Sequence, residues 1–305
     1  MKKILCVLCL MIICIVFTSC NDKNYSVIVP NGTPLLGISE YVVNNKDNVI
    51  ITKGSQELVS AWNSKSCDVI IMPITQAAKL YGISPNYVLY KTFVWGNLSL
   101  VSKEKLSSLN DINNKKIIVF GKNSTPDIIM KTLIDYYNLN VEIEYVQDVQ
   151  TANTLLISND SLIIVSAEPS LSKLKTKFDL NIIDLQDEWS KISNNSSYPQ
   201  AGIFVKKSLI DVTNFKKEVL EPLESAITLN ISSPINAASQ AILADNSFET
   251  LGYDTLIQAI PNCHFDISKT KKEEIQAIEY YFNTIINLGL GEQIGGKLPS
   301  EEFYN

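Results

Sequence analysis

The sequence predicts an α/β protein with two lobes that face each other across a cleft. Short β-branched runs alternate with segments of helical periodicity, which is typical of βαβ units and mainly parallel sheets. This alternation occurs in two successive sets along the chain. Extended segments near Asn97 and near Gly202 join the two sets, and we expect them to act as hinges.

The first set of elements begins directly after a short polar tether. We expect Ser55 to cap one of its helices and Gly82 to end another. In chain order, strands are expected at residues 26–30, 48–52 and 68–73, helices at 35–43, 55–63 and 74–82, and two extended runs at 87–95 and 98–102.

The second set repeats the alternation and leads into a helical C-terminal part. Extended runs are expected at residues 115–120, 142–146, 162–166, 180–185 and 201–207, with helices at 126–137 and 149–157 and a short helix from Pro169. From Asn214 onward the pattern is nearly all helical. We therefore expect one lobe to comprise residues 25–97 plus 205–305, and the other to comprise residues 98–204.

The N-terminus has the pattern of an export signal. Lys2 and Lys3 precede an uninterrupted apolar stretch, residues 4–17. A helix that spans a membrane needs about 20 apolar residues, so this stretch is too short to span, but it suits the apolar region of a signal peptide.

The signal ends in VFTSC, which resembles the lipobox of bacterial lipoproteins. In that motif a small residue precedes a Cys that carries lipid and becomes the new N-terminus. The resemblance implies a lipoprotein signal peptide over residues 1–19, lipidation at Cys20 and a tether over residues 20–24. It places the mature protein on the cell membrane, facing the periplasm or the exterior. An ordinary secretory signal with an incidental Cys20 is the alternative.

The composition argues for a globular protein that does not bind nucleic acid. Hydrophobic residues make up 46% and charged residues 19%, and the formal net charge is −6. A cationic stripe for nucleic acid is therefore not expected. All 26 basic residues are Lys. Without Arg, the planar fork that usually binds a carboxylate or phosphate through two hydrogen bonds is missing.

The Cys and His content gives no support to a metal or catalytic centre. Beyond the signal only Cys67 and Cys263 remain, and we expect two buried thiols, with a disulfide as the alternative. His264 is the only His, and no CxxC motif occurs, so we expect no metal and no cofactor. We also expect no catalytic residues, because no nucleophile–base pair or carboxylate dyad is evident.

Several segments, in their order along the chain, resemble one group of transport proteins. They are LSSLNDINNKKIIVFGKNSTPDIIMKTLI, EPS, LQDEW, YPQAGIFVKKSLI and the C-terminal IGGKLPSEEFYN. The set is similar to solute-binding proteins of the nitrate, sulfonate, taurine and thiamine-precursor group. The resemblance covers essentially the whole mature chain. It implies a type II periplasmic-binding-protein fold with two Rossmann-like lobes. It also implies a monomer that binds a small solute and delivers it to an ABC permease with its ATPase.

The segment GKNSTPD lies between an expected strand and helix. Ser124 or Thr125 suits the N-cap and Pro126 the first turn, so plain helix capping would explain it. The resemblance implies instead that Ser124 and Thr125 hold the ligand with N–H and hydroxyl donors. Asp127 in the first turn would repel a strongly charged anion, so we expect a neutral or weakly charged ligand.

Other candidates follow strand ends or lie at the crossings, where ligands bind in open α/β sheets. Trp95 could provide a stacking wall or pack in the core. Glu168 could recognise a ligand N–H or pair with Lys122. The full set of further ligand-binding candidates is Asn31, Gly32, Thr33, Thr75, Gln76, Trp95, Gly96, Asn97, Glu168, Tyr198 and Gln200.

These candidates favour a small flat heterocycle, of the thiamine-precursor kind, as the solute. Trp95 and Tyr198 would supply stacking faces, and the amides and hydroxyls would bind the ring edge. A sulfonate or nitrate held on backbone N–H groups is the alternative solute. Two other classes of protein stay open: an enzyme of the same fold acting on a small aromatic or pyrimidine substrate, and an orphan sensor or adhesin lipoprotein.

Overall fold

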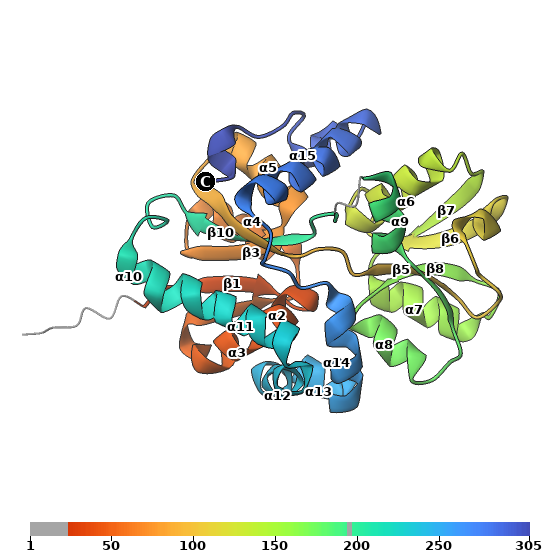
Figure 1. Ribbon diagram of the computed structural model, residues 1–305, viewed down its shortest axis with the longest axis horizontal. Helices are drawn as coiled ribbons and strands as arrows, with labels where there is room; N and C mark the ends of the chain where they lie inside the picture. The colour runs from red at the N-terminus through yellow and green to blue at the C-terminus, as the bar shows by residue number, and fades with distance from the viewer. Residues whose placement is uncertain (1–23, 194–196) are drawn as a thin grey trace, which may run out of the picture.

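The computed structural model describes residues 24–193 and 197–305, which contain two five-stranded sheets (Figure 1). The first sheet has the order β2-β1-β3-β10-β4, and the second has the order β7-β6-β8-β5-β9. The bounds are β1 Val27–Pro30, β2 Val49–Thr52, β3 Val69–Pro73, β4 Tyr87–Val94, β5 Leu98–Ser102, β6 Lys115–Phe120, β7 Val141–Val146, β8 Ile163–Ala167, β9 Asn181–Asp184 and β10 Ala201–Lys206. The α/β prediction is confirmed.

Each sheet contains one antiparallel strand that follows a crossing of the chain. Strand β5 is antiparallel to β8 and β9, and β10 is antiparallel to β3 and β4. Strands β1, β2 and β3 run parallel, as do β6, β7 and β8. Parallel strands send their carboxyl ends to the same edge of a sheet, so the turns that follow β1, β3 and β6 lie at equivalent positions in the two lobes.

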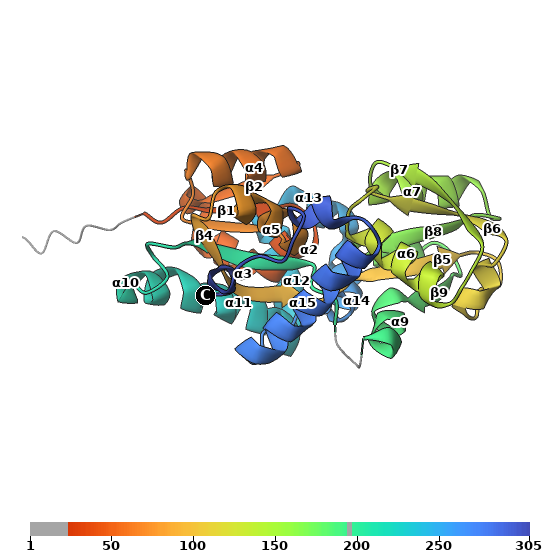
Figure 2. The same cartoon turned by 90° about the horizontal axis from the view of Figure 1, so that it is seen from above.

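Helices surround the two sheets, which form two bodies placed end to end (Figures 1 and 2). Beside the first sheet lie α2 Thr33–Gly37, α3 Ser39–Asn44, α4 Ser55–Ser64, α5 Ile74–Ile83, α10 Thr213–Phe215, α11 Glu221–Ser232, α12 Pro234–Ala244, α13 Asn246–Leu251, α14 Tyr253–Ala259 and α15 Lys271–Asn287. Beside the second lie α6 Thr125–Tyr136, α7 Val149–Ser158, α8 Ser170–Lys175 and α9 Leu185–Ile192. Among the described residues, no helix is long and apolar enough to cross a membrane.

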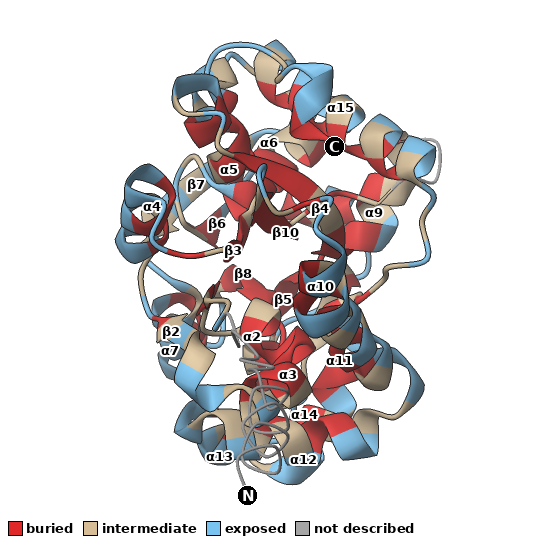
Figure 3. Ribbon diagram, turned by 90° about the vertical axis from the view of Figure 1, so that its left-hand side faces the viewer, coloured by how far each residue is buried: buried red, intermediate tan, exposed pale blue. Residues whose placement is uncertain are grey.

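The central strands form the buried core of each lobe, and most exposed residues lie on the outer helices, the loops and the edge strands (Figure 3). In the first lobe the Trp62 ring packs against Tyr87 and Phe204, with centroid distances of 4.8 and 5.8 Å. Cys67 and Cys263 are buried free thiols. The expectation of two unpaired thiols is therefore confirmed, and the disulfide alternative is wrong.

The chain passes between the two sheets at residues 95–97 and again between α9 and β10. Gly96 has a φ of 78°, and a Cβ there would lie 2.6 Å from Gln186 Oε1 and 2.7 Å from Tyr198 Cζ. Only glycine fits this turn. Gly202, expected at the second crossing, lies inside β10 opposite Met72 and Thr92. The second crossing therefore comes before Ala201.

Three local expectations are corrected by the structure. The helix expected over residues 35–43 is divided at Ile38, where α2 ends and α3 begins. Gly54 is the N-cap of α4, so Ser55 is its first helical residue. Helix α5 continues through Gly82 and ends at Ile83. The first difference divides one expected helix into two, and the other two shift a helix boundary by one residue. The order of the strands and helices is otherwise as expected.

Polar contacts hold the two bodies together away from the crossings. Lys173 Nζ in α8 donates to the Leu251 carbonyl oxygen in α13 at 2.7 Å. His264 precedes α15, and its Nε2 atom lies 3.4 Å from Asp184 Oδ2 at the end of β9. The described structure is therefore a form in which both lobes are in contact.

Candidate functional site

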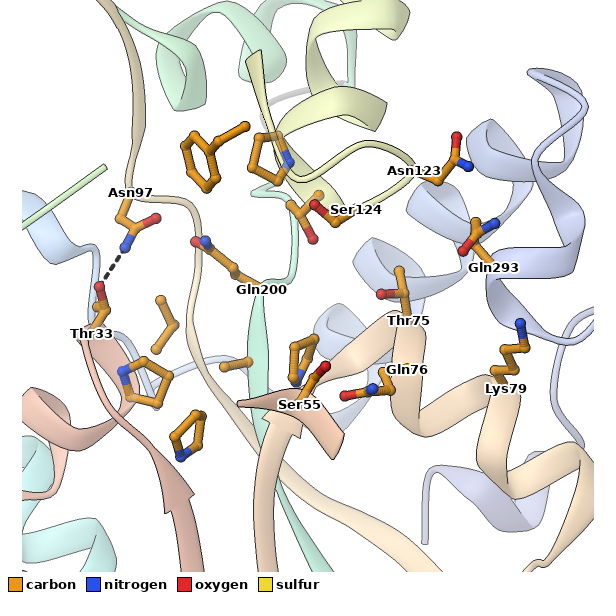
Figure 4. Close-up of a pocket in the computed structure, with 18 of the residues that line it drawn as sticks. Thr33, Ser55, Thr75, Gln76, Lys79, Asn97, Asn123, Ser124, Gln200 and Gln293 are labelled. Carbon is orange, nitrogen blue, oxygen red and sulfur yellow. Dashed lines mark hydrogen bonds between the residues drawn. The ribbon is translucent and has the colours of Figure 1, made fainter. Parts of the chain in front are cut away.

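A cavity of about 490 Å³ lies between the two bodies, at the carboxyl ends of parallel strands (Figure 4). Pro30 ends β1, Pro73 ends β3 and Phe120 ends β6, and all three line this cavity. The two sheets therefore present their strand ends to a common space. We call this cavity the first compartment.

Three helices of at least two turns begin at the first compartment. Ser55 opens α4, Thr75 lies in the first turn of α5, and Thr125 opens α6. A helix start carries N–H groups without intrahelical partners and the positive end of the helix dipole. Figure 4 shows the Thr75, Gln76 and Ser124 side chains around the same space, from opposite lobes.

Ser124 is the N-cap of α6, as one of the two sequence alternatives predicts, but its hydroxyl makes no cap hydrogen bond. The Ser124 Oγ donates instead to the Gly121 carbonyl oxygen at 2.5 Å. Thr125 and Pro126 are the first two helical residues. The side chain of the cap therefore leaves the N–H groups of Thr125 and Asp127 without a cap bond and available to a solute, whereas Pro126 has no N–H.

The charge in the first compartment is positive. Lys79 and Lys122 line it, and within the described residues no Asp or Glu does. Asp127 is fully buried and does not line this compartment, but it lies near it, as expected, because its carboxylate accepts from the N–H of the lining residue Asn123 at 2.8 Å. The same carboxylate accepts from Lys131 Nζ at 2.9 Å and Tyr145 Oη at 2.8 Å. Lys131 balances the Asp127 charge away from the cavity.

A second compartment of about 580 Å³ adjoins the first. It contains Asn31, Gly32 and Glu168 from the expected set. The two compartments share four lining residues, namely Thr33, Asn97, Phe120 and Gln200. They are therefore connected parts of one cleft.

A hydrogen-bond cluster joins the two lobes where the compartments meet. Thr33 Oγ1 donates to the Glu168 carbonyl oxygen at 2.7 Å. Asn97 Nδ2 donates to Thr33 Oγ1 at 2.6 Å and to the same Glu168 oxygen at 3.3 Å. Thr33 follows β1 and Glu168 follows β8, so this cluster links one sheet to the other.

The Glu168 carboxylate does not pair with Lys122, which corrects one of the two expected roles. Its oxygens accept from the Ser172 N–H and the Ser172 hydroxyl, each at 3.0 Å. Burial raises the pKa of Glu168 above its usual value, and the bonds from Ser172 only partly oppose this. The ionised carboxylate is therefore a cost to the folded protein at neutral pH.

We expect Glu168→Gln to stabilise the protein at pH 7 by on the order of 1 kcal/mol. A carboxyl whose pKa is raised on folding holds its proton more tightly in the folded state. Folding stability then falls as pH rises from about 4.5 through the raised pKa, and stays low above it. Gln cannot ionise, and its Oε1 can accept from the Ser172 N–H while its Nε2 donates to the Ser172 hydroxyl oxygen. Urea unfolding between pH 4 and pH 8 measures the effect. The exposed Glu301→Gln is the control, and an unchanged pH slope in Glu168→Gln would contradict the prediction.

Two aromatic residues expected in the site lie in the core instead. Trp95 is 2% exposed, and its Nε1 donates to the Asp266 carbonyl oxygen at 3.0 Å. Tyr198 is fully buried, and its hydroxyl accepts from the Leu98 N–H at 3.3 Å. Neither ring, nor Gly96 between the lobes, lines either compartment. The expectation that Trp95 and Tyr198 provide stacking faces is therefore wrong for this structure.

The remaining candidates divide between the compartments. The first compartment is lined by seven of the residues that the sequence predicts, namely Thr33, Thr75, Gln76, Asn97, Ser124, Thr125 and Gln200. Sequence reasoning missed Ser55, Lys79, Phe120, Asn123 and Gln293. Phe120 directly precedes GKNSTPD and ends its strand, so its position in the sequence could have predicted that it lines the cavity. Gln293 comes from the C-terminal part, and nothing local indicates it. The lipidation candidate Cys20 lies outside the described residues.

The arrangement is the type II periplasmic-binding-protein fold: two mixed sheets in two lobes, with a cleft at their strand ends. No family model and no curated protein matches the sequence. Solved structures that resemble it include solute-binding proteins of ABC transporters, and the likeness confirms the fold that the sequence resemblance predicts.

Three of these structures illustrate the likeness. An ABC transporter protein of Parabacteroides distasonis has a TM-score of 0.78 at 20% identity, covering 92% of this chain and 98% of that chain. The periplasmic aliphatic sulphonate binding protein of Escherichia coli has a TM-score of 0.68 at 10% identity, covering 92% and 99%. The alkanesulfonate-binding protein of Xanthomonas axonopodis pv. citri, bound to MOPS, has a TM-score of 0.61 at 12% identity, covering 92% and 96%.

Proposed function

We propose that this chain is the extracytoplasmic solute-binding component of an ABC importer and has no catalytic activity. One observation carries the proposal: a cleft lined by both apolar and polar side chains is built jointly from the strand ends of both sheets. Such a cleft can enclose a small solute when two hinged lobes close on it. The likeness to binding proteins of ABC transporters supports the same role. Its partners are then the solute and a permease with its ATPase.

The cleft favours a small organic anion, of the sulfonate type, over a neutral heterocycle. Three helix starts and the Lys79 and Lys122 side chains give the first compartment a positive potential. Helix starts bind an anion without any Arg. The Trp95 and Tyr198 rings that favoured a heterocycle are not in the cleft. Of the two carboxylates that favoured it, Glu168 lines only the second compartment and Asp127 lines neither. Phe120 lines both compartments and Phe248 lines the second, and these two aromatic rings keep a ring-bearing solute as the second candidate.

A thermal-shift panel tests the proposed function. It contains alkanesulfonates, nitrate, pyrimidines, flavins and amino acids. A solute at 100 times its Kd stabilises the folded protein by about 2.7 kcal/mol. We expect the sulfonates to raise the melting temperature. Stabilisation by pyrimidines alone would establish the second candidate. No stabilisation by any member would contradict the binding function.

Membrane attachment through Cys20 is part of the same proposal, supported by the lipobox-like VFTSC ending of the signal. Two acyl chains anchor a protein stably, whereas one chain alone binds marginally. We expect Cys20→Ser to move the protein from the membrane fraction to the soluble or secreted fraction. Retention of the cleaved variant in the membrane would contradict the proposal. Cleavage is checked by N-terminal mass, and Cys67→Ser is the matched control.

A further inference from the structure

Asn97 presents an unpaired amide oxygen to the cleft. Its side chain is only 4% exposed, and the Oδ1 atom is buried without a hydrogen-bond partner among the described residues. Figure 4 shows this oxygen turned toward the cavity, on the side of the amide opposite Thr33. A buried acceptor left without a donor is costly, so such atoms call for an explanation.

The orientation of the Asn97 amide is fixed by its neighbours. A carbonyl oxygen can only accept, so the atom that bonds the Glu168 oxygen must be the Asn97 nitrogen. Thr33 gives its own hydroxyl proton to the same Glu168 oxygen, and its Oγ1 therefore accepts from Asn97. Rotation of the amide would place oxygen against oxygen at both contacts. The cleft therefore faces an acceptor at this position.

A second acceptor lies beside the first. Gln200 Oε1 is likewise buried without a partner among the described residues, and Gln200 lines both compartments as Asn97 does. Both amides lie across the cavity from the Lys79 side chain (Figure 4). The first compartment therefore has a donor side, formed by the helix starts, and opposite it the fixed acceptor of Asn97, beside which Gln200 adds an amide that no described hydrogen bond orients.

We propose that Asn97 is a specificity-determining residue that selects solutes with a hydrogen-bond donor beside their anionic group. The donor, an O–H or N–H, meets Asn97 Oδ1 while the anion lies at the helix starts. A solute that lacks the donor buries this oxygen unpaired and binds more weakly. The inference rests on the proposed solute-binding function and adds the chemical class of the solute to it.

The test compares solutes that differ by one donor, measured by calorimetric titration of the whole mature chain. One pair is 2-hydroxyethanesulfonate and ethanesulfonate, and a second pair, aminopyrimidine and methylpyrimidine, covers the ring-bearing candidate. We expect the donor-bearing member to bind about tenfold more tightly, which corresponds to about 1.4 kcal/mol. In Asn97→Leu this preference is expected to disappear.

Asn230→Leu is the matched control. Asn230 is 1% exposed, its Nδ2 donates to the Gly37 carbonyl oxygen at 3.0 Å, and its Oδ1 also has no described partner. It lies outside both compartments, so its loss should leave the preference intact. If Asn97→Leu does not fold, Thr33→Val provides the test instead. Loss of the Thr33 hydroxyl removes one of the contacts that orient the Asn97 amide, so the preference for the donor-bearing solute should fall.

The outcomes separate the inference from the function on which it rests. Binding with equal affinity for both members of a pair overturns the role of Asn97 and leaves the binding function standing. The role of Asn97 is also overturned if Asn97→Leu keeps the preference for the donor-bearing solute. If Asn97→Leu does not fold, an unchanged preference in Thr33→Val overturns it. Failure of all four compounds to bind, together with failure of the wider panel, overturns the proposed function and the inference with it.

Discussion

Replacement of Ser124 by Asp is expected to weaken the binding of an anionic solute by on the order of 100-fold. Asp is as good an N-cap as Ser, so helix α6 should form as before. The new carboxylate lies in the first compartment, where within the described residues the wild-type chain has Lys79 and Lys122 and no acidic side chain. Two like charges about 4 Å apart repel by about 4 kcal/mol at an effective dielectric constant of 20. Solvent reduces this figure at the exposed Ser124.

The measurement is the Kd of the anion identified by the panel, with Ser233→Asp as control. Ser233 is the N-cap of α12 and, like Ser124, makes no side-chain cap bond and has a Pro in the first turn of its helix, but it lies outside the cleft. It adds the same charge to the molecule. Equal Kd values in Ser124→Asp and Ser233→Asp would contradict an anion at the start of α6. A neutral solute should be nearly insensitive to both variants.

Trp189→Ala is expected to cost about 3–5 kcal/mol of unfolding free energy, the usual range for a buried aromatic. The Trp189 side chain is fully buried. Its ring meets Tyr280 and Tyr281 edge-on, at centroid distances of 5.7 and 5.8 Å, and so joins α9 of the second lobe to α15 beside the first. Truncation removes packing from both lobes at once. Urea unfolding gives the loss.

Trp62→Ala provides the matched control, because Trp62 is equally buried but packs within the first lobe. Both variants should lose comparable stability. Only Trp189→Ala should also raise the radius of gyration of the folded protein in small-angle scattering, since it weakens a contact between lobes. An increase in both variants, or in neither, would show that the α9–α15 contact does not hold the lobes together.

The sequence by itself determines the order of elements and much of the cleft. β-branched runs alternating with helical periodicity specify buried strands and covering helices, because each pattern suits one backbone geometry. Parallel strands end at one edge, so turns far apart in the chain must meet there. Thr33, Thr75 and Ser124 could therefore be placed in one cleft from their positions after strands. Their chemistry as helix-start residues is equally local.

Only the tertiary structure decides which side chains face the solute and with what charge. Trp95 and Tyr198 lie within two residues of cleft residues in the sequence but turn into the core, where Asp266 and Leu98 satisfy their polar atoms. Lys131 balances the charge of Asp127, whose carboxylate does not line the cavity.

The direction of the Asn97 amide is likewise a property of the assembled fold. It depends on Thr33 and on the Glu168 carbonyl, which are 64 and 71 positions away in the chain. Gln293 reaches the first compartment from the C-terminal part of the chain. A sequence pattern records the preference of each residue for its local backbone. Burial, charge balance and hydrogen-bond direction arise from contacts between distant segments, and these exist only once the two lobes have packed together.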